Sequence, residues 1–412
     1  MKLILTGLCL FIIGNVTAQK AKLKQTTYRA VLVRKDSNEV IFNLQPKIEN
    51  GKQVLYAIND VDRIRITDVK IKGDSLLFNM PVFESSFFTK IYVDGSLQGI
   101  WQKGTRGEPQ TWPFKAFPNQ PFRFHTVKSD PAKNISGKWL VTFTNSNGTT
   151  EQAIALFKQS KNKLTGTFLT TTGDYRYLDG VVTGDSLKLS TFDGSHSYLF
   201  TARIDNSNQI SGGVYYFGNA TGKQLWTAEK NNNAVLPQQD APCSLQKGET
   251  GINFAFNDMD DKLISLKDEK YKDKVIIVDL MGSWCPNCMD ETKFLCEYYQ
   301  KNKSRGVEVI ALAYEYSTDL QRSKASLTKF RNKFKVEYPI LITGVTSGDE
   351  RKTQKTLPQL TPIQSFPTTI IIDKKGNVRE IQSVFYGPGT GKYYDDFVRD
   401  FNKTIDELLA EK

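Results

Sequence analysis

The sequence predicts a multidomain protein in which N-terminal all-β antiparallel modules precede a C-terminal α/β domain. Three observations support this class. The chain has 412 residues, which is too long for one ordinary hydrophobic core. Short apolar runs that alternate with polar residues fill its first half, and longer apolar runs separated by helical patterns fill its second half. The predicted parts are a signal peptide at 1–18, β modules at 19–130 and 131–232, a linker at 233–246 and the α/β domain at 247–412.

The N-terminus has the pattern of a secretory signal. Lys2 precedes an apolar run over residues 3–13, and the small-residue stretch 16–18 resembles a cleavage site. The run is too short to span a bilayer comfortably. We therefore expect an exported protein, periplasmic in location, that does not span the membrane once the signal is cleaved.

The first half alternates short β-type runs with polar breaks. Residues 28–103 predict a meander of strands, residues 109–131 a proline-rich packed connection, and the alternation resumes at Gly137. The segment 69–76, VKIKGDSL, is echoed by 181–187, VVTGDSL, which suggests a duplicated, barrel-like module.

The second half begins after a polar, proline-bearing stretch at 231–242, the expected domain boundary. Its continuous apolar runs are typical of strands in a parallel sheet that is buried on both faces. The expected elements are a hairpin within 253–266, strands at 275–281 and 307–314, a helix at 319–335, strands at 339–343 and 368–373, and a C-terminal helix with Phe397, Phe401, Ile405 and Leu408 on one stripe.

The residues Trp284-Cys285-Pro286-Asn287-Cys288 lie where an apolar strand meets a helical pattern. A thiol at a helix N-terminus is stabilised as a thiolate by backbone N–H groups and the helix dipole. Cys285 is therefore predicted to be the attacking nucleophile, accessible to solvent, and Cys288 the resolving thiol. Pro286 suits the first helical turn, where its missing N–H would have no intrahelical partner.

Half of a zinc site is the alternative for paired cysteines at this spacing, and it needs two further ligands. The chain has only two histidines, His125 and His196, and both lie far upstream. The remaining cysteines beyond the signal are singletons. We therefore predict redox chemistry, with no metal and no cofactor.

The strand, the Trp-Cys-Pro-x-Cys motif, the helix and the later Phe366-Pro367-Thr368-Thr369 resemble the TlpA/ResA-like group of thioredoxin-fold proteins. The resemblance covers roughly residues 250–412. It implies a thiol:disulfide oxidoreductase that reduces protein disulfides and is recharged by a membrane electron donor. The first half of the chain does not share it.

Two carboxylates are candidate catalytic groups. Asp279 lies inside the apolar run VIIVDLM, where an unpaired charge is costly, and the resemblance implies a buried acid at this position, six residues before Cys285. Burial raises a carboxyl pKa, which suits a general base for Cys288; a misjudged strand edge is the alternative. Glu315 ends the run VEVIALAY, beside which the resemblance implies a functional glutamate; a solvated strand end is equally compatible.

Four residues are expected to bind substrate: Trp284, Pro286, Phe366 and Pro367. The resemblance implies a cis-proline at Pro367 that exposes the backbone of Phe366 for pairing with a substrate segment. Trp284 is expected to shield Cys285 and to contact substrate. We also expect residues 359–366, which include Leu360, Ile363 and Phe366, to form a semi-rigid rim beside Cys285 that selects protein substrates, because Pro358 and Pro362 disfavour a continuous helix there.

Cys296 lies about 12 Å beyond Cys288 if one helix continues between them, too far for a disulfide. It therefore either pairs with Cys243 or remains a small buried hydrophobe, and we favour the pair.

The formal charge is +11 and the sequence pI about 9.1. The basic residues are scattered, and no nucleic-acid motif accompanies them, so we expect no nucleic-acid partner.

A second function class remains open: a ligand- or partner-binding β protein with an accessory redox domain. A large apolar cavity in the β half would favour ligand binding, and a filled barrel would favour a docking or spacer role. The Gly184-Asp185-Ser186-Leu187 and Asp193-x-x-His196 segments imitate a serine hydrolase, but both fall within one predicted hairpin, and the Gly-Asp pair is better explained as a turn.

Overall fold

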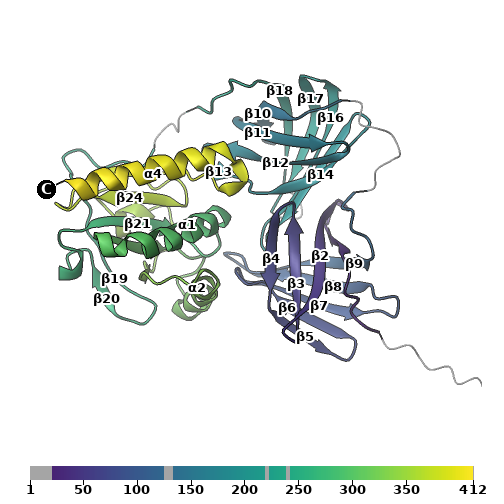
Figure 1. Cartoon of the computed structure of the whole chain (residues 1–412), viewed down its shortest axis with the longest axis horizontal. Coiled ribbons are helices and arrows are strands. Elements are labelled where there is room, and N and C mark those ends of the chain that lie inside the picture. The colour runs from purple at the N-terminus through teal and green to yellow at the C-terminus, as the bar shows by residue number, and fades with distance from the viewer. Residues whose placement is uncertain (1–20, 125–132, 219–221, 238–241, 412) are drawn as a thin grey trace, which may run out of the picture.

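The computed structural model describes residues 21–124, 133–218, 222–237 and 242–411. Figure 1 shows two β domains packed against each other and an α/β domain beside them. The signal peptide predicted for residues 1–18 lies outside the described residues, as does His125. Within the described ranges, no helix is both long and apolar enough to cross a membrane.

The first β domain is an antiparallel sheet of nine strands that surrounds one apolar core. Side chains alternate between its faces, as in β7, where Phe87 is buried and Phe88 is exposed. The strand order is β4-β3-β2-β1-β9-β8-β7-β6-β5. The strands are β1 (Tyr28–Val33), β2 (Glu39–Glu49), β3 (Lys52–Asn59), β4 (Asp62–Ile66), β5 (Asp68–Lys72), β6 (Ser75–Asn79), β7 (Ser85–Ile91), β8 (Leu97–Lys103) and β9 (Gln110–Pro118).

Strand β9 corrects the connection predicted over residues 109–131. It pairs with both β1 and β8 in the middle of the sheet. Trp112 and Phe114 face the core and Pro113, between them, faces solvent, so the inward–outward alternation continues through the proline.

The second β domain is a closed barrel. Apart from the short β13, each strand pairs with the next one along the chain, and β18 returns to β10. The order is β11-β10-β18-β17-β16-β15-β14-β12, with β11 also paired to β12. The short β13 extends the sheet from β12. The strands are β10 (Gly137–Thr144), β11 (Thr150–Ser160), β12 (Lys163–Thr170), β13 (Gly173–Asp174), β14 (Leu178–Thr183), β15 (Ser186–Phe192), β16 (Ser197–Asn206), β17 (Gln209–Tyr216) and β18 (Lys223–Lys230).

Packed aromatic rings occupy the barrel interior. The rings of Phe168 and Phe200 stack with centroids 4.6 Å apart, and Trp226 meets Phe168 edge-on. The first sheet differs, because its terminal strands β4 and β5 do not pair with each other among the described residues. Duplication of the two modules therefore stays a prediction.

Buried Arg123 joins the two β domains. Its Nη1 donates to the Ile41 carbonyl at 3.0 Å and to the Ser190 carbonyl at 3.1 Å, and its Nε lies 3.3 Å from Asp179. Asn59 donates from Nδ2 to the Phe192 carbonyl at 2.8 Å across the same interface. A buried guanidinium with these partners fixes the domains relative to each other.

The α/β domain holds a five-stranded sheet in the order β23-β22-β21-β24-β25, in which β21, β22 and β23 are parallel and β24 and β25 antiparallel. All residues of β21 are buried, as its continuous apolar sequence predicts. The elements are β19 (Ala255–Asn257), β20 (Leu263–Ser265), η1 (Glu269–Tyr271), β21 (Val275–Met281), α1 (Pro286–Asn302), η2 (Lys303–Arg305), β22 (Val307–Ala313), α2 (Leu320–Phe334), β23 (Ile340–Ile342), α3 (Lys352–Thr356), β24 (Thr368–Ile372), β25 (Val378–Gln382), η3 (Pro388–Thr390) and α4 (Lys392–Ala410).

The favoured disulfide between Cys243 and Cys296 is wrong. Both thiols are free. Cys243 belongs to the apolar cluster that contains Ile276 and Val278, whereas Cys296 packs against the cluster that contains Ile277. Successive residues of β21 point to opposite faces of the sheet, so the sheet lies between the two cysteines.

Candidate functional site

Cys285 and Cys288 lie at the start of α1, directly after β21. Cys285 is the N-cap of the helix, and its Sγ accepts a hydrogen bond from the Cys288 N–H at 3.2 Å. Pro286 occupies the first turn, as predicted. The N–H groups of this turn lack intrahelical partners, and a helix N-terminus favours negative charge in general.

Both thiols are buried, which corrects the predicted solvent accessibility of Cys285. Its exposed fraction is 3%, and that of Cys288 is 0%. The Cys285 Sγ lies 3.4 Å from the Phe366 carbonyl, and Trp284 and Phe366 pack edge-on beside it with ring centroids 5.8 Å apart. The covering segments come from other parts of the chain, so the CxxC motif alone did not indicate them.

Asp279 is fully buried in the middle of β21, so the strand-edge alternative is wrong. Neither of its carboxyl oxygens has a hydrogen-bond partner among the described residues. Burial, and then the neighbouring Glu291, raise the pKa of Asp279 well above its usual value. The protonated form is therefore the favoured one over a wide range of pH.

Glu291 is a second buried carboxyl, and the sequence analysis missed it. Its Oε1 accepts a hydrogen bond from Thr369 at 2.7 Å, and burial raises its pKa to about 7. It lies three residues after Cys288 on α1, a spacing that places both side chains on one helix face and could have indicated it.

The environment of Cys288 favours the protonated form of its thiol. Burial, followed by its hydrogen bond with Cys285 and by the charges of Cys285 and Asp279, raises the pKa of Cys288 well above its usual value. A thiol of this kind requires a base before it can attack.

Glu315 is buried after the end of β22, so the solvated strand end is wrong. It accepts hydrogen bonds from the Ser283 N–H at 2.8 Å and from the Ser283 hydroxyl at 2.6 Å. Burial raises the pKa of Glu315 to about 7. Since Ser283 lies two residues before Cys285, this carboxyl fixes the backbone that leads into the motif.

The substrate-side candidates meet around Cys285. The Phe366–Pro367 peptide bond is cis, as the resemblance implied. Trp284 donates from Nε1 to the Tyr314 carbonyl at 2.8 Å and stacks on Tyr316 with centroids 5.2 Å apart. The indole is therefore held in place, and it stays partly exposed.

The predicted rim is wrong for two of the three apolar residues expected to face the substrate. Leu360 and Ile363 are each 2% exposed and belong to the apolar core on the Cys243 side of the sheet. The prolines do interrupt the helix, but the chain between them turns its apolar side chains inward. Phe366 remains partly exposed, and the pocket lining in this segment comes from Gln364, Ser365 and Phe366.

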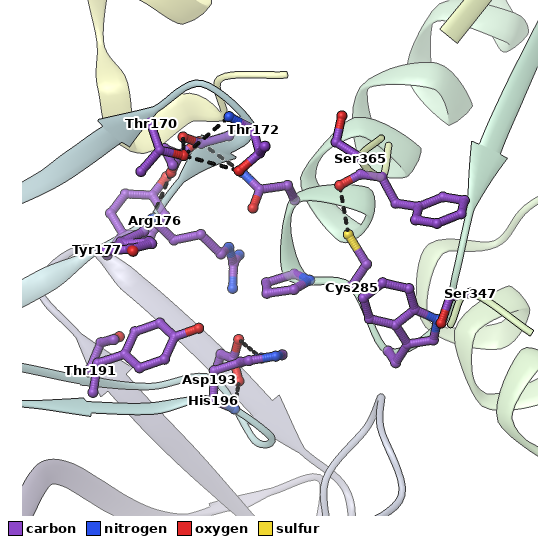
Figure 2. A pocket seen from close by; sticks show the side chains of 18 of the residues that line it. Thr170, Thr172, Arg176, Tyr177, Thr191, Asp193, His196, Cys285, Ser347 and Ser365 are labelled. Atoms are coloured by element: carbon purple, nitrogen blue, oxygen red, sulfur yellow. Dashed lines mark hydrogen bonds and ion pairs between the residues drawn. The ribbon is translucent and has the colours of Figure 1, made fainter. Parts of the chain in front are cut away.

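An interdomain cavity of about 370 Å³ lies in front of Cys285 and is lined by all three domains. Its volume is near the lower end of the range for small-molecule sites. Figure 2 shows Arg176 and the Asp193–His196 pair on one side and Cys285 with Ser365 on the other. The residues that line the cavity include Arg106 of the first β domain, Arg176, Asp193, His196 and Tyr198 of the second, and Cys285 of the α/β domain.

The second β domain binds the residues that flank the active cysteines. Asp174 accepts hydrogen bonds at Oδ2 from Asn287 Nδ2 at 3.1 Å and from the Gly387 N–H at 2.7 Å. Burial raises the pKa of Asp174 to about 6. Arg176 binds Asp290 through two hydrogen bonds, so the barrel is attached to the first turn of α1 at two points.

The first β domain attaches to α2. Glu84 accepts two hydrogen bonds from Arg322, each of 2.7 Å, and a third from Ser326 at 3.1 Å. Phe83 beside it belongs to the apolar cluster that contains Cys285. Both β domains thus contribute to the walls around the redox motif, which no local sequence pattern indicated.

Comparison with known proteins finds relatives of the C-terminal part of the chain. Residues 246–394 match the Redoxin family model. The thiol-disulfide oxidoreductase ResA of Bacillus thuringiensis subsp. konkukian is 31% identical over 134 residues, which are 32% of this chain and 68% of ResA. ResA of Bacillus anthracis is 32% identical over 136 residues, 33% of this chain and 69% of that protein.

A solved structure of a thiol:disulfide interchange protein from Chlorobium tepidum TLS is 19% identical to this chain. It covers 40% of this chain and 100% of its own, with a TM-score of 0.29. On the matched family model, and on relatives whose length it covers by more than two thirds, the chain belongs through its C-terminal domain to the ResA-like thiol:disulfide oxidoreductases.

Proposed function

We propose that this protein reduces protein disulfides outside the cytoplasm through the Cys285–Cys288 dithiol. The observation that carries the proposal is the hydrogen bond from the Cys288 N–H to Cys285 Sγ at the start of α1, on the wall of the interdomain cavity. Cys285 attacks one sulfur of the substrate and forms a mixed disulfide. Cys288 then attacks Cys285, so the substrate gains two electrons and the dithiol becomes a disulfide.

The surrounding residues have distinct proposed roles. In its ionised form, Asp279 accepts the Cys288 proton during the second step, and Glu315 positions the backbone before Cys285. Trp284, Pro286 and Phe366 line the cavity in which the substrate cysteine is presented, and Pro367 follows Phe366 through the cis peptide bond. No cofactor enters this scheme, since the two cysteines carry both electrons.

The reduction potential of the dithiol tests the proposed direction. The purified full chain is equilibrated with thiol buffers of known potential, and the Cys285–Cys288 disulfide is quantified by mass spectrometry. A reductase requires a potential near or below that of thioredoxin, about −270 mV, whereas a value near −120 mV is that of a strong oxidant and would refute the direction.

Two variants test the assignment of the cysteines. Cys288→Ser should accumulate a mixed disulfide with protein substrates, because attack by Cys285 is kept and release is lost. Cys285→Ser should form none. Accumulation in Cys285→Ser instead would reverse the two roles.

Export and a membrane electron donor complete the proposal. The apolar run at residues 3–13 and the small residues at 16–18 support a cleaved signal. The oxidised dithiol needs an external reductant for each turnover. That this reductant is a membrane electron donor is inferred from the family resemblance alone. Cell fractionation with N-terminal sequencing of the mature chain tests the export, and retention of residues 1–18 in the cytoplasmic fraction would contradict it.

The alternative function places the activity in the β half, with the redox domain as an accessory. The packed aromatic interior of the barrel supports docking instead of ligand storage inside it. The contacts of Asp174 and Arg176 with α1 support a role of the second β domain at the redox site itself.

A further inference from the structure

The turn between β15 and β16 faces the active cysteine across the interdomain cavity. Asp193 and His196 lie on this turn, and both line the cavity with Cys285 (Figure 2). The pair comes from the second β domain, about ninety residues before the CxxC motif. The redox chemistry proposed above makes no use of it.

Asp193 fixes the orientation of the imidazole. Its Oδ1 accepts the N–H groups of Ser195 at 2.8 Å and His196 at 2.7 Å, and its Oδ2 lies 3.0 Å from His196 Nδ1. Although burial acts to raise it, the interactions with His196 lower the pKa of Asp193 to about 2, so the carboxylate stays ionised. A carboxylate on Nδ1 leaves Nε2 as the nitrogen available for proton transfer.

The imidazole lies close to the redox core. Its edge meets the ring of Phe83 with centroids 5.7 Å apart, and Phe83 packs in the same apolar cluster as Cys285 and Cys288. The His196 side chain is 19% exposed. Among the residues that the structure describes, no hydrogen-bond partner contacts Nε2, so that nitrogen is free to meet a bound molecule.

Other charged and titratable side chains surround the Asp193–His196 pair, and several of them already have partners within the protein. Arg176 is bound by Asp290 and faces Asp62, and Lys103 donates to the Ser195 carbonyl at 2.9 Å. Arg106 and Lys352 also line the cavity. Burial raises the pKa of Tyr198 well above its usual value, which makes it a poor acid.

A proton donor on this wall would speed the proposed reaction. When Cys285 attacks a disulfide, the leaving sulfur departs on the side away from Cys285 and carries the electron pair of the broken bond. The exchange is slow when that thiol is weakly acidic, because its thiolate is a poor leaving group. A positioned acid removes this penalty by donating a proton as the bond breaks.

We propose that His196, oriented by Asp193, is the general acid that protonates the leaving thiolate of the substrate. The inference rests on the proposed function, and it names the substrate as a disulfide whose leaving sulfur is an ordinary aliphatic, cysteine-like thiol. The Cys285–sulfur bond forms, the substrate S–S bond breaks, and the Nε2 proton moves to the departing sulfur. Neutral His196 is reprotonated by solvent before the next cycle, and in the reverse reaction it acts as the base.

Two substrates and one variant test this acid. His196→Asn keeps a donor near the position of Nδ1 for Asp193 but cannot transfer a proton. Single-turnover reduction is measured near pH 7 with hydroxyethyl disulfide, whose thiol is weakly acidic, and with dipyridyl disulfide, whose leaving group needs no proton. The variant should be slower by at least about tenfold on the first and unchanged within about twofold on the second.

Control variants separate an acid from a structural residue. Asp185→Asn changes a carboxylate in the exposed turn between β14 and β15 and should match the wild type on both disulfides. Asp193→Asn, which should free the imidazole, is expected to lose rate on hydroxyethyl disulfide alone. The pH profile of the wild type on hydroxyethyl disulfide should differ from that of His196→Asn, whereas the two profiles on dipyridyl disulfide should match.

The outcomes distinguish the two proposals. Equal losses on both disulfides, or no loss on either, would overturn the role of His196 while leaving the dithiol reductase intact. If His196→Asn does not fold, the same comparison with Asp193→Asn decides in the same way. A wild type that reduces neither disulfide, with Cys285→Ser indistinguishable from it, would overturn the proposed function and this inference with it.

Discussion

Arg176 in the second β domain binds Asp290 on α1 through two charge-assisted hydrogen bonds, Nε to Oδ2 at 2.7 Å and Nη2 to Oδ1 at 2.8 Å. Both side chains are largely buried. Asp290 follows Cys288 by two residues, so the position of the barrel is linked to the first turns of the redox helix. Removal of one member of such a pair leaves a buried charge without its partner, at a cost of about 3–5 kcal/mol.

Arg176→Met should therefore lower the free energy of unfolding by about 3 kcal/mol and loosen the barrel from α1. The reduced variant should be alkylated at Cys285 faster than the wild type, because the cavity wall recedes. Thermal unfolding and peptide mapping after timed iodoacetamide treatment measure the two effects. The double variant Arg176→Met, Asp290→Leu should regain much of the stability. Unchanged alkylation in Arg176→Met would mean that the barrel does not limit access.

Gly173 tests the same contact by steric means. Its φ is +143°, and a Cβ there would lie 3.0 Å from Asn287 Nδ2, inside the CxxC motif. Gly173→Ala should displace Asn287 and change the rate of thiol–disulfide exchange. Gly184 is the matched control, since its φ is also positive, at +58°, and its added Cβ would meet nothing within 4 Å. Gly184→Ala should lose about 1 kcal/mol from strain in the left-handed region, and Gly173→Ala about 1–3 kcal/mol, because its φ lies outside that region. Equal rates of thiol–disulfide exchange in Gly173→Ala and Gly184→Ala would show that the contact between Gly173 and Asn287 does not affect the redox site.

Glu315 should make stability depend on pH. Its pKa is about 7 in the folded protein against an ordinary value of 4.5, because it is buried. The folded state therefore holds the proton more tightly, and the stabilisation is complete below about pH 4.5 and lost as the pH rises through about 7. Glu315→Gln resembles the protonated form and can keep both contacts with Ser283. At pH 8 it should be more stable than the wild type by about 3 kcal/mol, and the gap should close near pH 4. Urea unfolding at the two pH values measures this, and a constant gap would contradict the assignment.

The sequence predicted the parts of the site that depend on local pattern. The uninterrupted apolar run made β21 a central strand and made Asp279 a buried acid. The CxxC motif with Pro286 located the start of α1, because helix capping depends on neighbouring residues. The alternation of apolar and polar residues also predicted the meanders of the β half. It did not predict β9, because Pro113 within that strand indicated a break in the pattern.

The parts that depend on distant contacts could not be predicted. Burial of Cys285, the free state of Cys243 and the inward turn of Leu360 follow from how separate segments meet. The attachment of Arg176 to Asp290 joins residues 114 positions apart. The His196–Asp193 pair was visible as a motif, but its position opposite Cys285 required the packing of the barrel on the α/β domain.

The burial of Leu360 and Ile363 leads to a prediction about stability instead of substrate selection. Because both side chains are packed in the core of the α/β domain, Leu360→Ala or Ile363→Ala should lower the free energy of unfolding by about 2–5 kcal/mol. When either substitution is combined with Cys288→Ser, the folded protein should trap the same set of substrate proteins as Cys288→Ser alone. Gln364→Ala, at an exposed cavity-lining position, is the comparison, since it should leave stability intact. Unfolding curves and identification of the trapped proteins decide between a core and a rim.

Asp279 and Glu291 provide the last prediction, which concerns the second step of the exchange. The pKa of Cys288 is raised well above its usual value by burial first, so the thiol must lose its proton to a neighbour as it attacks Cys285. Asp279 has two oxygens without hydrogen-bond partners among the described residues, whereas one oxygen of Glu291 is occupied by Thr369. Asp279 is therefore the better placed acceptor in its ionised form.

Asp279→Asn should slow release of a preformed mixed disulfide by at least about tenfold and leave the first attack by Cys285 nearly unchanged. Glu291→Gln should have a smaller effect on release, because it removes only a neighbouring charge and keeps an acceptor for Thr369. Stopped-flow measurements that follow attack and release separately distinguish the steps. A larger effect of Glu291→Gln would transfer the role of base to Glu291. Equal release rates in the wild type and both variants would leave proton removal to solvent, and then the release rate should rise with pH until the Cys288 thiol itself ionises.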